Sequence, residues 1–430
     1  MGLKVPAAQS VQEGGFVVLE SGDGLFYGLV VDLQLGALDP RYVEEAVARR
    51  LSPRAAELLQ KQTLFTNLEV LPALMLERGP EPGDLDYESW RKAHPEDPRP
   101  MPIKTIPFHR ADARLATAGD VAEIFGSPEK DGNFIIGRTR EQDHPVCINL
   151  DKFVQRSSGI FGATGTGKSF LTRILLAGLI EHNAASVLVL DMHNEYGFDD
   201  TSSDTGLSVA GLRYKFPARV RVVGLGRATT IRGKTPDWHL EIDETDIQPV
   251  DIELLTRELN LRETTSTTLD ALLHSFGGKE WYTRFKALKV GLMTEDEGGK
   301  KVPAPGSVAF WANQEGVNVA AAEGLHSKLG RVFNRPYIVR RGEDDKTPDG
   351  LKEIIKALQA GQHIVLSFGE YESDLDYLLV SNLLTRKIRE AWEESTNEFR
   401  SHGKNEPRPL VIAVEEAPKL LNREMAAQTS

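Results

Sequence analysis

A glycine-rich run in the middle of the chain has the residue types and spacing that bind polyphosphate. It fits the pattern G-x4-G-K-[ST] and consists of Gly162, Ala163, Thr164, Gly165, Thr166, Gly167, Lys168 and Ser169. Glycines let the backbone curl so that successive N–H groups face the phosphates, and a following helix adds its positive end. Lys168 would contact the β- and γ-phosphates and act in catalysis, while the Ser169 hydroxyl would bind Mg²⁺. The run therefore predicts ATP and Mg²⁺ as cofactors.

Two adjacent acids follow the last apolar run of the chain. Leu410–Val414 has the composition of a buried strand, and Glu415 and Glu416 come directly after it. Strands often end in solvated acids, so this signal is weak by itself. Beside a phosphate loop, one acid can hold the Mg²⁺ shell and the next can polarise the attacking water. We therefore assign Glu415 to the metal and Glu416 to water activation.

A third polar segment, with the sequence DMHNEY, begins at the end of another apolar run, Ser186–Asp191. Open parallel sheets bind their ligands at the carboxyl ends of their strands. Asp191 and Glu195 are therefore candidates to approach the nucleotide or its water. A capping or turn role for both residues remains the alternative.

The elements around these motifs predict an α/β fold. We expect a strand at Gly159–Phe161, then the glycine loop, a helix over Phe170–His182 and the strand Ser186–Asp191, which together make a βαβ unit. Continuous apolar runs such as Ser186–Asp191 are typical of strands buried on both faces of a parallel sheet. Gln362–Phe368 is a further buried strand, and a helix is expected from about Leu375 to Trp392. The sheet should therefore be mostly parallel.

The N-terminal part has a different pattern. Phe16–Leu19 and Leu25–Leu33 are rich in β-branched and aromatic residues and flank Ser-Gly-Asp-Gly, which predicts a hairpin. Leu64–Leu76 adds a strand, and Arg41–Gln62 has a helical pattern. A small barrel or sandwich with a helical excursion follows from this reading.

The expected domain boundaries come from these changes in pattern. Residues 1–128 form the N-terminal module, which includes a proline-rich, charged linker at 79–102. Residues 129–430 form the nucleotide-binding core, and its stretch from about 250 to 335 reads as a mostly helical insertion.

Composition limits the classes of partner. The 430 residues carry a net charge of −12, which argues against a surface that is coated with nucleic acid. A short basic loop with Arg227, Arg232 and Lys234 could still grip DNA phosphates, although a solvated hairpin tip explains it equally well. The single cysteine, Cys147, excludes a disulfide framework, and the sequence has no signal peptide or membrane-length apolar run. We therefore expect a cytoplasmic location with no membrane partner.

Taken together, GATGTGKS, DMHNEY and EEAPKLL resemble the HerA family of hexameric DNA-translocating ATPases. The N-terminal FVVLESGDGLFYGLVVDL is similar to the small β-barrel of that family, while Pro418 stands where the family usually has His. The resemblance implies a RecA-like P-loop NTPase preceded by a β-barrel and assembled as a hexameric ring. It also implies double-stranded DNA in the pore and a NurA-type nuclease, or an effector of anti-phage defence, as partner.

Two further expectations come from this resemblance. Arg156 matches the position of a family arginine that reaches the γ-phosphate in the neighbouring subunit, although an exposed loop arginine is the alternative. The family continues beyond the point that corresponds to Ser430, so the chain is expected to lack the C-terminal part. DNA end resection and anti-phage defence both remain open as roles. An ATP-dependent scaffold that assembles an effector with little motor activity is the alternative to a motor.

Overall fold

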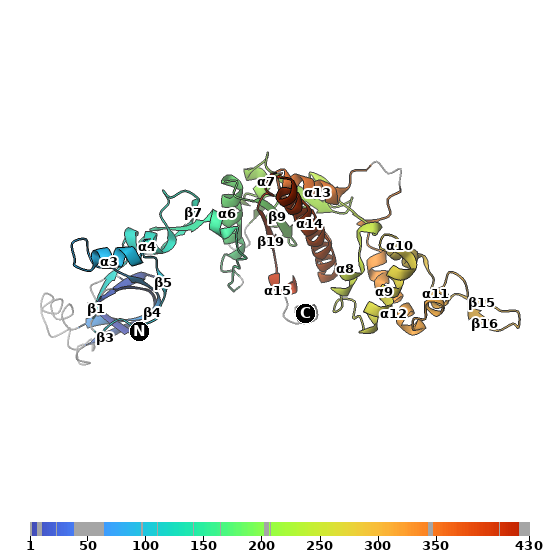
Figure 1. Cartoon of the computed structure of the whole chain (residues 1–430), viewed down its shortest axis with the longest axis horizontal. Helices are drawn as coiled ribbons and strands as arrows, with labels where there is room; N and C mark the ends of the chain where they lie inside the picture. Colours follow the sequence, from blue (N-terminus) through green and yellow to red (C-terminus); the bar gives the residue numbers. More distant parts are fainter. Residues whose placement is uncertain are drawn as a thin grey trace. The chain divides into compact units, whose positions relative to one another are not determined.

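The computed structural model describes residues 2–6, 11–22, 24–37, 64–95, 98–109, 111–140, 142–163, 165–201, 206, 208–342, 347–403 and 405–420. The chain forms two compact units, Met1–Ser158 and Gly159–Ser430 (Figure 1). Among the helices that the structure describes, none combines the length and apolar character needed to cross a membrane.

A six-stranded antiparallel sheet makes up most of the first unit. Its strands run in the order β1-β4-β3-β2-β6, and β5 pairs with β4. They are β1 (Gly2–Pro6), β2 (Phe16–Ser21), β3 (Gly24–Ala37), β4 (Leu64–Glu77), β5 (Met101–Pro102) and β6 (Asp112–Leu115). The hairpin of β2 and β3 is confirmed, with Ser21 opposite Gly24 at its turn. The described residues show no pairing between β1 and β6, so closure into a barrel stays a prediction.

Short elements complete the first unit. Helix α4 (Ala118–Phe125) packs Val121 against Val18 of the sheet and begins at a capping box made by Thr117 and Asp120. The other elements are α3 (Tyr87–Ala93), which lies in the expected linker, the hairpin of β7 (Asn133–Arg138) and β8 (Pro145–Asn149), and α5 (Leu150–Phe153). Because β8 packs on α4, the hairpin groups with this unit, and the expected boundary after residue 128 falls inside it. The helix expected at Arg41–Gln62 lies outside the described residues.

A five-stranded parallel sheet forms the centre of the second unit. The strand order is β13-β12-β18-β9-β19, and every neighbouring pair is parallel. The strands are β9 (Ser186–Asp191), β12 (Val220–Leu225), β13 (Trp238–Leu240), β18 (His363–Ser367) and β19 (Leu410–Val414). Every residue of β9 and β18 is buried, as their continuous apolar runs predict.

The prediction of a strand directly before the glycine loop is wrong. The structure assigns no strand at Gly159–Phe161, and Phe161 is 93% exposed. A strand needs a hydrogen-bonding neighbour, and no strand of the described sheet pairs with this segment.

Helices surround the parallel sheet. They are α6 (Lys168–Glu181), α7 (Leu212–Lys215), α13 (Gly350–Gln359), α14 (Asp374–His402) and the short α15 (Ala417–Leu420). α14 runs well past Trp392, where its expected end was placed. Its last third is polar and mostly exposed, so the apolar periodicity that marked the helix stops before the helix does. Two short pairs complete the unit, β10 (Asp200–Thr201) with β11 (Ser208–Val209) and β14 (Ile242–Asp243) with β17 (Ile338–Val339).

The insertion between β14 and β17 is mostly helical, as predicted. It contains η2 (Glu244–Asp246), α8 (Pro249–Glu253), α9 (Thr264–Phe276), α10 (Trp281–Ala287), α11 (Val308–Glu315) and α12 (Val319–Phe333). A hairpin of β15 (Met293–Glu295) and β16 (Lys301–Pro303) was not predicted. Trp281, Tyr282 and Phe285 are fully buried and belong to one continuous core that also includes the sheet. The insertion is therefore packed onto the core and not tethered by a linker.

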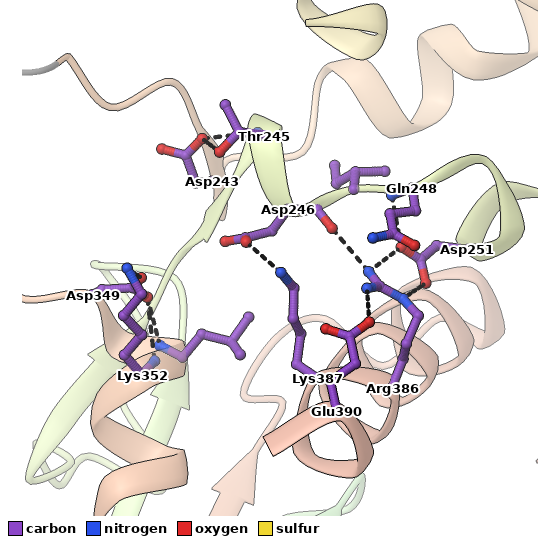
Figure 2. Close-up of polar contacts among 12 residues, drawn as sticks. Asp243, Thr245, Asp246, Gln248, Asp251, Asp349, Lys352, Arg386, Lys387 and Glu390 are labelled. Atoms are coloured by element: carbon purple, nitrogen blue, oxygen red, sulfur yellow. Dashed lines mark hydrogen bonds and ion pairs between the residues drawn. The ribbon is translucent and has the colours of Figure 1, made fainter. Parts of the chain in front are cut away.

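Ion pairs reinforce the junction between this insertion and α14 (Figure 2). Arg386 Nη2 lies 2.7 Å from Asp251 Oδ2, and Lys387 Nζ lies 2.9 Å from Asp246 Oδ1. Asp251 is 1% exposed, and the Arg386 guanidinium neutralises its buried negative charge. We call these four residues the junction pairs.

Candidate active site

The glycine loop has the curled backbone that its sequence predicts. Gly165 and Gly167 have φ of 80° and 89°, a region that residues with a Cβ rarely adopt. A Cβ at Gly162 would lie 2.6 Å from Thr166 Oγ1, so a larger residue there would displace the Thr166 side chain. Thr166 Oγ1 donates to the Ala163 carbonyl at 2.7 Å. Thr164, a predicted member of the phosphate site, lies outside the described residues.

Lys168 and Ser169 are the first residues of α6. The Lys168 ammonium donates to the carbonyls of Gly162 and Ala163 at 3.0 and 2.9 Å, so the side chain lies over the loop. The helix N-cap, Gly167, supplies no side-chain acceptor to the first-turn N–H groups. These donors, the helix dipole and the ammonium together suit an anionic ligand.

The loop after β9 is organised by Asp191. This side chain is fully buried, and its carboxylate accepts the backbone N–H groups of Glu195, Tyr196 and Gly197 at 2.7, 3.0 and 3.3 Å. Burial raises the pKa of Asp191, while these hydrogen bonds oppose the rise. In this structure Asp191 thus performs the turn role that was its alternative, and Glu195 lies half-buried in the loop that it holds.

Glu415 lies beside Asp191 at the same edge of the sheet. The preceding residues, Val414 and Leu190, are register partners of β19 and β9. The Glu415 carboxylate accepts the His193 N–H at 3.2 Å. Burial and the charge of Asp191 raise the pKa of Glu415 well above its ordinary range. Within the described part of the chain neither carboxylate has an ion-pair partner, so this edge favours a bound cation.

Glu416 is exposed and has an unusual backbone. Its φ is +46°, in the left-handed region that few residues other than glycine adopt. The carbonyl of the preceding Glu415 accepts a hydrogen bond of 2.8 Å from the Tyr377 hydroxyl. The orientation of the peptide between the two glutamates is therefore constrained by a side chain of α14.

Tyr196 is a buried residue of the loop after β9. Burial, followed by the charge of Glu415, raises its pKa, and the nearby Ser169 side chain opposes the rise. Ser169 at the start of α6 and Glu415 after β19 therefore approach the same buried tyrosine. Sequence reasoning included Tyr196 in a motif but gave it no role, and it missed Tyr377. The only signal for Tyr196 in the sequence is a hydroxyl-bearing aromatic residue five positions after the end of the strand Ser186–Asp191.

The remaining predicted residues lie elsewhere. Arg156 is exposed and belongs to the first unit, whereas the phosphate loop belongs to the second. In the basic loop each side chain contacts an acid. Arg227 Nε lies 2.8 Å from Glu241, Lys234 Nζ lies 3.4 Å from Asp199, and Arg232 pairs with Asp200. A role of these cations on DNA stays a prediction.

The donor set at the edge fits Mg²⁺. The Ser169 hydroxyl and the Glu415 carboxylate are hard oxygen ligands, and the buried Asp191 carboxylate lies beside Glu415. The described residues contain no group of three or more His, Cys, Asp or Glu that could hold a metal alone. This fits Mg²⁺, which proteins commonly bind through one or two side chains together with substrate phosphates and water.

A curled glycine loop at the start of a helix, beside a parallel sheet with acids at its carboxyl edge, defines a P-loop ATPase. The model of the family described as "Helicase HerA, central domain" matches residues 134–388, more than half of the chain. The chain therefore belongs to the HerA family. No curated protein matches it. Membership confirms the predicted RecA-like P-loop α/β fold of the core, and HerA proteins are generally hexameric.

Proposed function

We propose that this protein is an ATP-hydrolysing motor that translocates on double-stranded DNA as a hexameric ring. The observation that carries the proposal is that α6 and the acids after β19 both contact the loop after β9, in a chain of the HerA family. Arg173 of α6 lies over the Tyr196 ring at 5.6 Å from its centroid, and Glu415 accepts the His193 N–H at 3.2 Å. This arrangement supports a nucleotide held between the glycine loop and the acids after β19. ATP hydrolysis supplies the energy for such movement.

Each residue of the site has a proposed task. The backbone N–H groups of the glycine loop and Lys168 bind the phosphates. Ser169 and Glu415 would hold Mg²⁺, which neutralises phosphate charge. Glu416 polarises the attacking water, and Asp191 and Glu195 shape the loop beside it. A subunit-crossing role for Arg156 would supply further positive charge.

The partners follow from the same proposal. DNA would pass through the pore and contact Arg227, Arg232 and Lys234, which would exchange their acidic partners for phosphates. A NurA-type nuclease or a defence effector would act on the DNA, in end resection or in anti-phage defence. We place the protein in the cytoplasm.

One observation favours a second function. All three cations of the basic loop already contact carboxylates, which makes them less available to bind DNA phosphates. An ATP-dependent scaffold that assembles an effector and turns over slowly would not need them free. This alternative uses the same nucleotide site.

The two functions differ in how DNA affects ATP turnover. The motor predicts that linear duplex DNA stimulates phosphate release several-fold, and that Lys168→Ala removes nucleotide binding and turnover. Turnover that ignores DNA, together with an ATP-dependent assembly with the effector, supports the scaffold. Turnover that is unchanged in the Lys168→Ala variant contradicts both functions.

A further inference from the structure

We infer that Tyr377 is a positioning residue for hydrolysis: its hydroxyl fixes the peptide that joins Glu415 to Glu416. The inference rests on the proposed function, because it concerns the same site. It adds a residue of α14 that neither the sequence motifs nor the family match assigns.

The geometry places this hydroxyl at one backbone atom. Tyr377 Oη lies 2.8 Å from the Glu415 carbonyl oxygen, which belongs to the peptide plane that precedes the Glu416 N–Cα bond. Rotation of that plane changes φ of Glu416 directly. Burial, followed by the charge of Glu415, raises the pKa of Tyr377, and the charges of Asp191 and Glu416 add to the rise. The hydrogen bond therefore acts on the peptide between two acids of the proposed site.

The backbone at Glu416 needs such a constraint. A φ of +46° is sparsely populated for a glutamate, and strained residues keep their conformation only when the surroundings determine it. The pairing of Val414 with Leu190 fixes the chain before the two glutamates, and α15 begins at Ala417 after them. Tyr377 supplies the fixed point between these two anchors.

Tyr377 is itself rigidly held. Its side chain is fully buried, and its ring packs edge-on against Phe368 at a centroid distance of 5.0 Å. It lies in the first turns of α14, which begins at the N-cap Ser373. A hydroxyl on a rigid ring restricts the peptide at a low entropic cost, because little motion is lost when the bond forms.

Removal of the hydroxyl separates positioning from folding. Tyr377→Phe keeps the ring and its contact with Phe368, so the fold should remain. We expect kcat for ATP to fall about ten- to hundredfold, since small misplacements of catalytic groups cost up to about this much. The Kd for ATP should change less than twofold. Amide hydrogen exchange of the segment 414–418 should accelerate in the absence of nucleotide.

Tyr337→Phe is the matched control. Tyr337 is equally buried, and its hydroxyl donates to Asp376, the residue before Tyr377, at 2.6 Å. This variant should keep kcat within twofold of the wild type and leave exchange at 414–418 unchanged. Equal losses of kcat in both variants would show a general structural effect and overturn the inference, as would a Tyr377→Phe variant with unchanged kcat and unchanged exchange.

The same assays distinguish a failure of the proposed function from a failure of the role of Tyr377. Wild-type protein and Glu416→Gln are measured beside the tyrosine variants. If the wild type does not hydrolyse ATP, or Glu416→Gln hydrolyses it normally, the proposed function fails. The exchange measurement then still decides whether the Tyr377 hydroxyl holds this peptide, because it requires no turnover.

Discussion

Carboxylates in two regions of the second unit have different surroundings. At the junction of the insertion, Asp251 is 1% exposed and its oxygens lie 2.9 and 2.7 Å from Nε and Nη2 of Arg386 (Figure 2). At the carboxyl edge of the sheet, Asp191 and Glu415 lie side by side. Their carboxylate oxygens accept hydrogen bonds from backbone N–H groups, and among the described residues no cationic side chain forms an ion pair with them.

Acids thus serve structure at the junction and, by the proposed function, ligand binding at the edge of the sheet. A buried acid with its own arginine is neutralised before any ligand arrives. Two adjacent acids without a cation repel each other, which costs stability unless a positive ligand binds. Other acids near α14 follow the junction pattern, since Asp376 pairs with Arg335 and Glu244 with Lys286. The edge of the sheet is therefore where an added cation and its nucleotide gain most.

The largest expected effect is on catalysis at the edge. Glu416→Gln removes the carboxylate that would polarise water and should lower kcat about 10³-fold. The Kd for ATP should stay within twofold, because Gln keeps the shape of the side chain. Glu394→Gln, at an exposed position of α14, is the control and should leave kcat unchanged. Normal turnover in Glu416→Gln would remove the assignment of the base.

The next effect is on stability at the junction. Arg386→Met leaves Asp251 buried without its cation and should lower the free energy of unfolding by about 3 kcal/mol. Arg389→Met provides the control, because the Arg389 side chain is 80% exposed and pairs with Glu393 on its own helix. Its cost should stay below about 0.5 kcal/mol. Urea unfolding of both variants measures the difference, and equal midpoints would contradict the structural role of the junction pairs.

A pH effect is expected at the opposite end of the same sheet. His363 is 1% exposed at the start of β18, and burial, with the charges of Arg408 and Arg219, lowers its pKa to about 4. Because the unfolded chain binds this proton at higher pH, stability is complete above pH of about 6.5 and is lost as pH falls toward 4. Between pH 7 and 4.5 the wild type should lose about 2 kcal/mol more than His363→Gln. The same dependence of the free energy of unfolding on pH in the wild type and in His363→Gln would contradict this prediction.

The smallest effect has the opposite sign at the two regions. In the absence of Mg²⁺ and nucleotide, Glu415→Gln should raise stability by about 1 kcal/mol, because it removes one of two adjacent charges. The raised pKa means that the wild type loses stability as pH rises above about 5, so the advantage of Gln grows toward pH 8. Asp251→Asn should instead lower the melting temperature. A loss of stability in both Glu415→Gln and Asp251→Asn would contradict the difference between the edge of the sheet and the junction.

Much of the sheet could be predicted from the sequence. The strands Ser186–Asp191 and Leu410–Val414 have the expected bounds. Every residue of the first is buried, as its continuous apolar run predicts, whereas every residue of the second is only partly buried, at the end of the strand order. The glycine loop could be predicted because its conformation is local and depends on residues without a Cβ. The strand at Gly159–Phe161 could not, since a strand depends on a neighbour that composition does not reveal.

The parts of the site that escaped prediction are contacts between distant segments. His193 donates its N–H to the Glu415 carboxylate, and Tyr377 donates to the carbonyl of Glu415, across separations that no periodicity encodes. The pairing of Arg227 with Glu241 was also invisible, because a basic loop reads the same with or without nearby acids. Charge counted along the sequence therefore overstates the cations that are free to bind a ligand.

The central claim is that the glycine loop and the acids after β19 act on one nucleotide. It is tested most directly by titrating wild type and Glu415→Gln with a slowly hydrolysed ATP analogue, with and without Mg²⁺. The account predicts that Mg²⁺ tightens binding to the wild type at least tenfold and to Glu415→Gln much less, while the affinities without Mg²⁺ are equal or favour Gln. The same Mg²⁺ dependence in both proteins would contradict it.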